Sequence, residues 1–442
     1  MSLKIGVVGA YRGKSMIDVL MVYKEAELVA ICDFFEPALK NVERQAKKLG
    51  LNNITYYTEF DEFLKHDGLD AVVLANYANE HAPFAIKCLN AGKHVMSEVL
   101  PCETMAQAVE LIEAVERSGK VYAYAENYCY MSHTFEMWKT YEKGEIGEVK
   151  YAEGEYVHDC SSVWPQISYG DKTHWRNRMY PTFYCTHSLG PIITITGRRP
   201  VKVIGYEFPP NMFNYSVTGG AGGGGMEMVT LDNGAVVKSL HAGLKREPSD
   251  RGFNYQVYCE KGMMETGRFE ENSSFNYYQE EKNRTCEGEW KKYEPVNDIQ
   301  SELMKQFPTH GGGDFYSTYF FVQKILGKPD GKWSIDVYQA VDMGICGILA
   351  WRSALNGNQP VDVPNLRNPE ERDAYRNDHA CTTEEVAGDQ LLPRTSYPNM
   401  PKCPDEMYKK MEKLWKEGKN ANGDPDLIYS AILDVTDKEN YN

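Results

Sequence analysis

The N-terminal part of the chain alternates short apolar segments with amphipathic ones. Residues 4–13 are apolar through Val8 and then rich in glycine, which is typical of a buried strand that enters a tight turn. Residues 15–24 follow with apolar positions at helical spacing. Continuing the alternation, we expect strands at 28–33, 54–57, 71–74, 94–97 and 121–124, and helices at 37–49, 60–65, 81–90 and 104–119. This order predicts an α/β fold whose six parallel strands complete a doubly wound sheet by about residue 125.

Beyond this point the pattern changes to strands in which polar and apolar residues alternate. We expect these strands at 150–158, 202–207, 227–231, 235–241 and 255–260, with turns such as Asp232-Asn-Gly234 between them. Such strands indicate a large, mainly antiparallel sheet. Residues 315–325 and 335–355 have helical patterns, so the second domain is expected to be α+β.

Other stretches follow neither pattern. The glycine run 219–225 predicts a mobile loop, and residues 265–296 have no clear period. The end of the chain contains several prolines and a charged amphipathic segment at 405–417, which we interpret as an extension able to pack on a neighbouring subunit. We therefore divide the chain into a doubly wound domain (1–125), an α+β domain with an open sheet (126–364) and a C-terminal extension (365–442).

The composition narrows the range of partners. The 442 residues carry a formal net charge of −15, which argues against nucleic acid or an anionic membrane and favours a neutral or cationic small molecule. No apolar run reaches membrane-spanning length and no leader pattern precedes the first strand, so we expect neither anchoring nor export. The 11 cysteines are scattered and include no C-x-x-C pair, which favours a reducing, cytoplasmic location without a disulfide framework.

The glycine turn after the first strand carries the first chemical signal. Backbone N–H groups of such a turn can approach a pyrophosphate, although Gly9 and Gly13 do not have the G-x-G-x-x-G spacing. Asp33 ends the second strand, where a carboxylate can bind the ribose hydroxyls, and no arginine follows it to accept a 2′-phosphate. The combination favours NAD over NADP as cofactor. The alternatives are an ordinary strand–turn–helix corner and a carboxylate that caps the next helix.

Several motifs occur in an order that resembles one enzyme family. They are Ala91-Gly-Lys-His-Val95, Ser97-Glu98-Val-Leu-Pro101 and Glu126-Asn127. Over about residues 4–364 the chain resembles the glucose–fructose oxidoreductase and inositol dehydrogenase (Gfo/Idh/MocA) family. The resemblance implies a Rossmann domain followed by a domain whose sheet holds a sugar against the nicotinamide. The cofactor contacts that it implies are Gly9, Tyr11, Arg12, Gly13, Asp33, Asn76, His81, Glu98 and Asn127.

The chain also departs from this family. Its dehydrogenases usually carry Glu-Lys-Pro after the fifth strand and an Asp four residues before a His, but here valine and leucine follow Glu98, and Phe183 stands four residues before His187. The segment Tyr184-Cys-Thr-His187-Ser-Leu-Gly-Pro191 is instead similar to a signature of the NAD-dependent α-N-acetylgalactosaminidases, a glycosidase branch of the superfamily. Further matches to that branch are Glu126-Asn-Tyr-Cys-Tyr130, His310-Gly-Gly-Gly-Asp314 and Val361-Asp-Val-Pro364. This resemblance implies a cycle of ring oxidation, loss of the aglycone, hydration and re-reduction.

The resemblance implies that Glu98, Tyr130, Tyr184 and His187 line the active site. Removing a hydride from a secondary alcohol requires a group that takes the hydroxyl proton, and a histidine beside a tyrosine can do so near neutral pH. Tyr130 could then remove an acidified C–H proton, provided that a nearby cation lowers its pKa. If residues 184–187 are helical, Tyr184 and His187 share one face, but Pro181 leaves a loop equally open.

Other residues are candidates for binding the substrate. We expect this role for Glu98, Trp175, Arg176 and His310. Every candidate has a structural alternative, such as a hydrogen-bonded histidine, a core aromatic ring or a capping carboxylate. No standard metal-binding spacing is formed by Asp159, Cys160, Asp171 and His174, so we expect no metal site there.

The sequence thus predicts an NAD-dependent enzyme that oxidises a ring hydroxyl of a sugar or glycoside. If the keto sugar leaves, the enzyme is a dehydrogenase. If the hydride returns after elimination, the enzyme is a redox-neutral glycosidase. A non-catalytic NAD(H)-binding sensor is a third hypothesis. We also expect a homo-oligomer, either a dimer or a tetramer, because exposed sheet faces in this family commonly pair.

Overall fold

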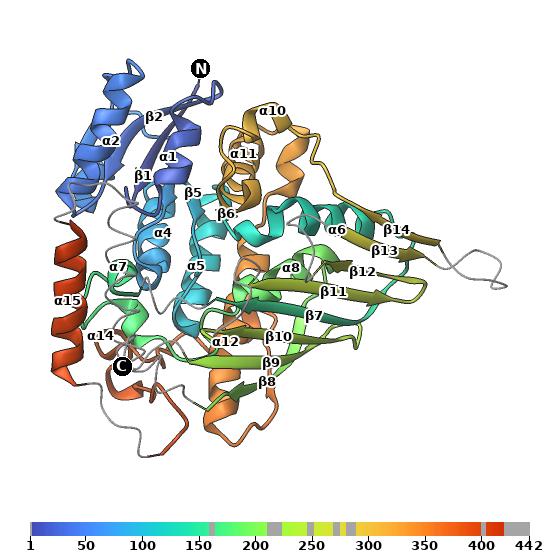
Figure 1. Cartoon of the computed structure of the whole chain (residues 1–442). Helices are drawn as coiled ribbons and strands as arrows, with labels where there is room; N and C mark the ends of the chain where they lie inside the picture. Colours follow the sequence, from blue (N-terminus) through green and yellow to red (C-terminus); the bar gives the residue numbers. More distant parts are fainter. Residues whose placement is uncertain are drawn as a thin grey trace.

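The computed structural model describes residues 2–158, 164–209, 223–244, 252–267, 275–279, 289–398 and 404–419. Its elements form two sheets, with helices packed around and between them (Figure 1). One sheet is parallel and six-stranded, and the other is mixed and nine-stranded. The predicted fold class, a doubly wound α/β sheet followed by an α+β part with a mainly antiparallel sheet, is confirmed.

The first sheet occupies the N-terminal part of the chain. Its strands are β1 (Leu3–Val8), β2 (Ala26–Cys32), β3 (Thr55–Tyr57), β4 (Ala71–Leu74), β5 (His94–Ser97) and β6 (Tyr122–Tyr124). The connecting helices are α1 (Lys14–Leu20), α2 (Glu36–Lys48), α3 (Phe60–Phe63), η1 (Ala78–Glu80), α4 (His81–Asn90) and α5 (Met105–Ser118). The strand order is β3-β2-β1-β4-β5-β6, so the direction of winding reverses between β1 and β4. Ligands of such sheets bind at the carboxyl ends of the strands beside this reversal.

The second sheet follows in the chain. Its strands are β7 (Val149–Val157), β8 (Pro200–Glu207), β9 (Gly224–Leu231), β10 (Val236–Ala242), β11 (Phe253–Cys259), β12 (Gly262–Thr266), β13 (Phe275–Gln279), β14 (Glu289–Tyr293) and β15 (Val361–Asp362). They are ordered β14-β13-β12-β11-β7-β10-β9-β8-β15. The central strands β7 and β10 are parallel neighbours, and the other pairs are antiparallel.

The structure differs from the sequence pattern in two stretches. Residues 265–296, which have no clear period, contribute to β12 and supply β13 and β14, because backbone pairing extends the sheet without a hydrophobic alternation. In the glycine run, Gly224 and Gly225 begin β9 instead of forming a loop, whereas residues 219–222 lie outside the described residues. A Cβ on Gly225 would lie 2.9 Å from the carbonyl oxygen of Pro181, so glycine permits another segment to approach this strand.

Long buried helices join the two sheets. The helices of this part are η2 (Asn127–Tyr130), α6 (Ser132–Glu142), α7 (Trp164–Ile167), η3 (Trp175–Arg178), α8 (Thr186–Thr196), α10 (Ser301–Met304), η4 (Thr309–Gly312), α11 (Gly313–Ile325), η5 (Pro329–Trp333) and α12 (Val337–Leu355). The helix α8, which is buried along its whole length, packs on β7 and β10. The helix α12 packs on β8 and also contacts α5, so it ties the second sheet to the first domain.

The C-terminal segment returns to the N-terminal domain. It contains α13 (Pro369–Arg372), α14 (Glu384–Ala387), η6 (Gly388–Gln390) and α15 (Asp405–Lys419). The helix α15 runs along the edge of the molecule toward α2 (Figure 1) and packs against α7 of its own chain. Within the described ranges, no helix is long and apolar enough to cross a membrane.

Candidate active site

The glycine turn after β1 folds back tightly against the end of β4. Gly9 has a φ of +94°, and a Cβ at this position would lie 2.2 Å from the carbonyl oxygen of Ala75. The N–H of Gly13 donates to the carbonyl oxygen of Gly9 at 3.0 Å, and a Cβ on Gly13 would lie 2.3 Å from the same oxygen. Only glycine fits both positions, which makes a narrow cradle at the N-terminus of α1.

Asp33 holds the other side of this turn. Its carboxylate accepts hydrogen bonds from the backbone N–H groups of Ala10, at 2.7 Å, and Phe35, at 2.8 Å. Burial raises the pKa of Asp33, whereas these backbone bonds act to lower it. The carboxylate therefore lies fixed at the tip of β2 beside the turn, which is the position that ribose hydroxyls require.

A cavity of about 380 Å³ opens from the turn along the carboxyl ends of the strands. It is lined by most of the predicted cofactor contacts, namely Gly9, Tyr11, Arg12, Asp33, Asn76, His81 and Glu98. Two buried atoms of these residues, Asn76 Oδ1 and His81 Nε2, have no hydrogen-bond partner within the described residues. Burial lowers the pKa of His81 to about 4, so its ring is neutral. The glycine cradle and these unpartnered polar atoms fit a bound dinucleotide.

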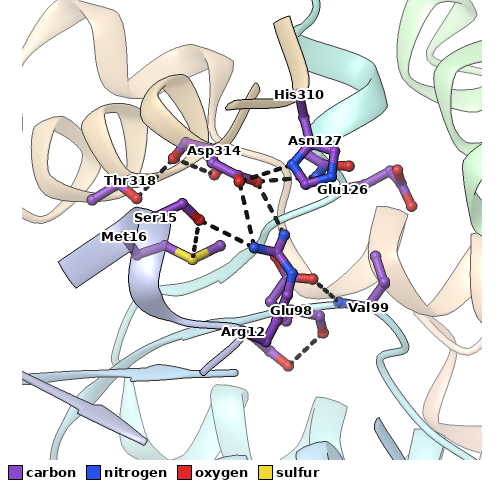
Figure 2. A network of polar contacts seen from close by, with 12 residues as sticks. Arg12, Ser15, Met16, Glu98, Val99, Glu126, Asn127, His310, Asp314 and Thr318 are labelled. Atoms are coloured by element: carbon purple, nitrogen blue, oxygen red, sulfur yellow. Dashed lines mark hydrogen bonds and ion pairs between the residues drawn. The ribbon is translucent and has the colours of Figure 1, made fainter. Parts of the chain in front are cut away.

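Arg12 connects the glycine turn to two acidic residues (Figure 2). Its Nη2 atom lies 2.5 Å from Glu98 Oε1 and 3.0 Å from Asp314 Oδ1, at the start of α11. Asp314 also accepts a hydrogen bond from Asn127 Nδ2 at 3.0 Å, and its second oxygen lies 2.9 Å from His310 Nδ1. The network therefore joins the first domain to η2, η4 and α11.

The network places strong charges in a buried region. The side chains of Glu98 and Asp314 are 5% and 1% exposed. Burial acts to raise the pKa of Asp314, but Arg12 and His310 hold it well below its usual range, whereas burial raises the pKa of Glu98. The guanidinium of Arg12 is engaged by the two carboxylates, because buried carboxylates require a cationic partner.

A second cavity, of about 470 Å³, lies between the first domain and the mixed sheet. Arg12, Glu98 and Tyr184 line both cavities, so the two are adjoining. His187, on the first turn of α8, lines the second cavity, and its Nδ1 lies 2.6 Å from Glu126 Oε1. The Nδ1–H donates to this carboxylate, which leaves Nε2 of the ring as the acceptor.

Glu126 is the carboxylate that contacts His187. It lies 61 residues away in the chain, whereas Phe183 stands four residues before His187, where related dehydrogenases carry an aspartate. The side chain of Glu126 is fully buried, and its Oε2 has no hydrogen-bond partner among the described residues. The sequence did not assign Glu126 to His187, because no local pattern links two residues this far apart.

Three tyrosine rings surround the imidazole of His187. The ring centroids of Tyr128, Tyr156 and Tyr184 lie 4.4 Å, 4.8 Å and 4.9 Å from that of His187. All three tyrosines line the second cavity. Tyr184 precedes α8, which begins at Thr186, so of the two alternatives that the sequence left open the structure has Tyr184 outside the helix. Burial raises the pKa of Tyr184. Sequence reasoning missed Tyr128 and Tyr156.

Tyr130 lies away from both cavities. It is 1% exposed, and its hydroxyl donates to the carbonyl oxygen of Trp333 at 3.0 Å and accepts from the N–H of Ile335 at 3.1 Å. Burial raises the pKa of Tyr130 well above its ordinary value. The structure therefore does not bring Tyr130 to the predicted site, and Tyr128 occupies the position next to His187.

The remaining substrate candidates lie at the border of the two cavities. Trp175 is buried and lines the cofactor cavity, and its ring is stacked near Tyr184 at 6.2 Å between centroids. The guanidinium of Arg176 lies 4.4 Å from the centroid of the Trp175 ring and lines both cavities. His310 and Asn127 line the second cavity. The structure thus gathers these candidates, except Tyr130, around one continuous space.

Of the four residues whose spacing fits no standard metal site, the structure describes Asp171 and His174. Asp159 and Cys160 lie outside the described residues. Elsewhere, in the ranges that the structure describes, no group of three or more His, Cys, Asp or Glu side chains is arranged to hold a metal ion. His174 accepts a hydrogen bond from the backbone N–H of Arg176 at 3.2 Å, and burial lowers its pKa to about 3.

The parallel sheet, the glycine cradle and the carboxylate on β2 define a dinucleotide-binding fold. Residues 3–126 match the model of the oxidoreductase family with an NAD-binding Rossmann fold (Gfo/Idh/MocA). The resemblance found in the sequence is therefore confirmed, and so is NAD as the cofactor of the family.

Curated relatives and solved structures match most of the chain. The chain is 23% identical over 405 residues to glycosyl hydrolase family 109 protein 1 of Phocaeicola vulgatus, which covers 83% of this chain and 84% of the relative. A levoglucosan dehydrogenase solved with NADH and levoglucosan is 16% identical, with a TM-score of 0.65, and covers 82% of this chain and 100% of that one. The scyllo-inositol dehydrogenase from Lactobacillus casei is 17% identical, with a TM-score of 0.61, and covers 83% and 100%.

Proposed function

We propose that this protein oxidises a ring hydroxyl of a sugar or a glycoside, with NAD as the hydride acceptor. The observation that carries the proposal is the pair His187 and Glu126, 2.6 Å apart, in a cavity that adjoins the cofactor cavity. The similarity to a levoglucosan dehydrogenase and a scyllo-inositol dehydrogenase supports a cyclic polyol as substrate.

The chain's own residues can manage the hydroxyl proton. Nε2 of His187 accepts the proton of the ring hydroxyl, and Glu126 stabilises the positive charge that the imidazole then carries. A nicotinamide held in the adjoining cavity would supply the acceptor for the hydride of the same ring carbon. Tyr184 and Arg176, which line both cavities, orient the sugar ring, while Glu98 and His310 contact its other hydroxyls.

A redox-neutral glycosidase is the second candidate. The similarity to glycosyl hydrolase family 109 proteins and the position of Tyr128 against His187 both favour it. Once a ring hydroxyl has become a carbonyl, the neighbouring C–H is acidic, and Tyr128 is the tyrosine that can take its proton as the aglycone leaves. Addition of water, followed by return of the hydride to the ring carbon and of a proton from His187 to the ring oxygen, would complete a cycle with no net change in the cofactor.

One assay separates these functions. The protein is incubated with NAD and a panel of free sugars and aryl glycosides, while NADH and released aglycone are followed. Accumulation of NADH without aglycone identifies a dehydrogenase. Aglycone release without net NADH, together with deuterium uptake from heavy water beside the anomeric carbon, identifies the glycosidase. Binding of NAD with neither signal identifies a sensor and contradicts both enzymatic functions.

Variants test the assigned proton route. We expect His187→Ala to lower kcat by about 10²- to 10⁴-fold, because proton transfer by a positioned side chain contributes this much. Glu126→Gln, which keeps the size of the side chain, should lower kcat by about 10²-fold because the partner of the imidazolium is neutral. His379→Ala is the matched control, since His379 is exposed and outside both cavities. Full turnover in His187→Ala would contradict the assignment.

The location and assembly of the protein complete the proposal. We expect a cytoplasmic homo-oligomer, either a dimer or a tetramer. The free cysteines within the described ranges are mostly buried, which suits a reducing compartment. The face of the second sheet opposite α8 and α12 offers a surface for pairing of subunits. Light scattering of the purified protein measures the assembly, and a monomeric mass at micromolar concentration would contradict it.

A further inference from the structure

The C-terminal helix α15 is docked beside the cofactor cavity. Tyr408 and Met411 of this helix are buried and form a small apolar cluster with Trp164 of α7. At the start of the helix, Asp405 pairs with Lys172 at 2.6 Å. These contacts fix α15 against the segment that precedes η3, and Figure 1 shows the helix running on toward α2.

The helix α15 lies very close to the turn at Tyr169 and Gly170, which precedes η3. Gly170 has a φ of +64°, and a Cβ there would lie 2.3 Å from the Cα of Glu412. The backbone of the turn at Tyr169 and Gly170 therefore touches the backbone of α15. Tyr169, the neighbour of Gly170, lines the cofactor cavity, so the docked helix reaches the border of that cavity.

A separate cleft of about 610 Å³ lies between α15 and the first domain. Its aromatic lining consists of Phe34, Phe35, Tyr77, Tyr169, Tyr408 and Trp415. Phe34, Tyr77 and Tyr169 also line the cofactor cavity, so the cleft continues that cavity at the Asp33 end.

The rings in the cleft form a chain of contacts from the first domain to the helix. The ring centroid of Tyr77 lies 5.8 Å from that of Phe34 and 6.2 Å from that of Tyr169. Trp415 lies 5.8 Å from Tyr169 and 6.3 Å from Phe35. Phe34 is 67% exposed although it is large and apolar, and it directly follows Asp33. An exposed ring beside the ribose position suits a flat aromatic base, which gains from stacking.

We propose that this aromatic cleft holds the adenine ring of NAD, and that Trp415 of α15 closes the cleft over it. The C-terminal helix is then part of the cofactor site and slows the release of NAD. The proposal rests on NAD as the cofactor but not on the reaction that the protein catalyses. Retention of the cofactor suits a cycle in which the hydride returns to the substrate.

The test measures cofactor release without any substrate. The protein loaded with NADH is mixed rapidly with excess NAD, and the loss of nicotinamide fluorescence gives the release rate. We expect Trp415→Ala to raise this rate by about tenfold, because a stacking contact with a base is lost. Trp415→Leu, which keeps apolar bulk for docking of the helix, should also raise it. Glu406→Gln, an exposed change in the first turn of α15, is the matched control and should leave it unchanged.

A shorter ligand identifies the part of the cofactor that is held. Reduced nicotinamide mononucleotide lacks the adenosine half, so its Kd should be the same in the wild-type protein and in both Trp415 variants. An unchanged NADH release rate in folded Trp415→Leu overturns the proposal. Equal weakening of NADH and of the mononucleotide also overturns it, since the helix would then support the whole fold and not the adenine site. Both outcomes are independent of the turnover assay.

Discussion

Tyr128 and Tyr130 are two positions apart on η2, yet they have opposite environments. The ring of Tyr128 lies against His187 and lines the second cavity, whereas the hydroxyl of Tyr130 bonds the backbone of Trp333 and Ile335. The sequence motif Glu126-Asn-Tyr-Cys-Tyr130 contains both residues and does not distinguish them. Which of them reaches the cavity depends on how a single helical turn is rotated, and a short turn has no hydrophobic period to reveal this.

Phenylalanine substitutions separate the two roles. Tyr128→Phe should lower kcat by about 10²-fold and leave the melting temperature almost unchanged, because a hydroxyl in the cavity acts on the substrate. Tyr130→Phe should lower the free energy of unfolding by about 1–3 kcal/mol, since it leaves a buried carbonyl and a buried N–H unpartnered. Calorimetry and kinetics on both variants provide the measurement. A large loss of kcat in well-folded Tyr130→Phe would restore Tyr130 as the base.

The roles of residues were easiest to predict from the sequence where a local conformation requires one residue type. The glycine cradle and Asp33 were found because a tight turn and a strand end have fixed chemistry. Glu126 and Asp314 were not assigned roles, because their partners are far away in the chain, at His187 and Arg12. Long-range pairing of charges depends on how the domains pack, which local patterns do not encode.

At the scale of elements, the turn from β1 into α1 carries the cofactor cradle. Its geometry depends on the close contact between Gly9 and the carbonyl group of Ala75 at the end of β4. The alternating strands and helices of the first domain were predicted within a few residues, because strands buried on both faces leave continuous apolar runs. The strands β13 and β14, at one end of the second sheet, were missed, because pairing by backbone bonds alone leaves no such pattern.

Alanine at Gly9 tests the cradle. A Cβ there meets Ala75 and requires a strained φ of +94°, so we expect Gly9→Ala to weaken NAD binding by at least tenfold. Gly50→Ala is the matched control, because Gly50 also has a positive φ, +76°, but a Cβ there meets nothing within 4 Å. It should lower stability by about 1 kcal/mol and leave the Kd for NAD unchanged. Equal Kd values for both variants would show that the turn does not contact the cofactor.

At the scale of the whole molecule, the second sheet contains a fully buried carboxyl group. Glu227 on β9 is 0% exposed, and neither of its side-chain oxygens has a hydrogen-bond partner within the described residues. Burial raises the pKa of Glu227 to about 8. The folded protein therefore keeps this carboxyl protonated at neutral pH, while the unfolded chain loses the proton near the ordinary glutamate pKa of 4.5.

This difference couples the stability of the protein to pH. Between the unfolded pKa of 4.5 and the folded pKa of about 8, the folded state binds one more proton, so stability falls as the pH rises through this window. The stabilisation that comes from the protonated Glu227 carboxyl is fully present below the unfolded pKa and is lost above the folded pKa. We expect the free energy of unfolding to fall by roughly 3 kcal/mol between pH 4 and pH 7 for this reason. The free energy of unfolding of Glu227→Gln should not show this part of the pH dependence, because glutamine cannot ionise.

Urea denaturation of both proteins across this pH range measures the effect. Near pH 4 the two free energies of unfolding should be close, because the wild-type carboxyl is protonated in the fold and mostly protonated in the unfolded chain. Toward pH 8 the wild-type protein should become progressively less stable than Glu227→Gln. Parallel curves for the two proteins would mean that Glu227 ionises inside the sheet at its ordinary pKa, which its burial between β8 and β10 argues against.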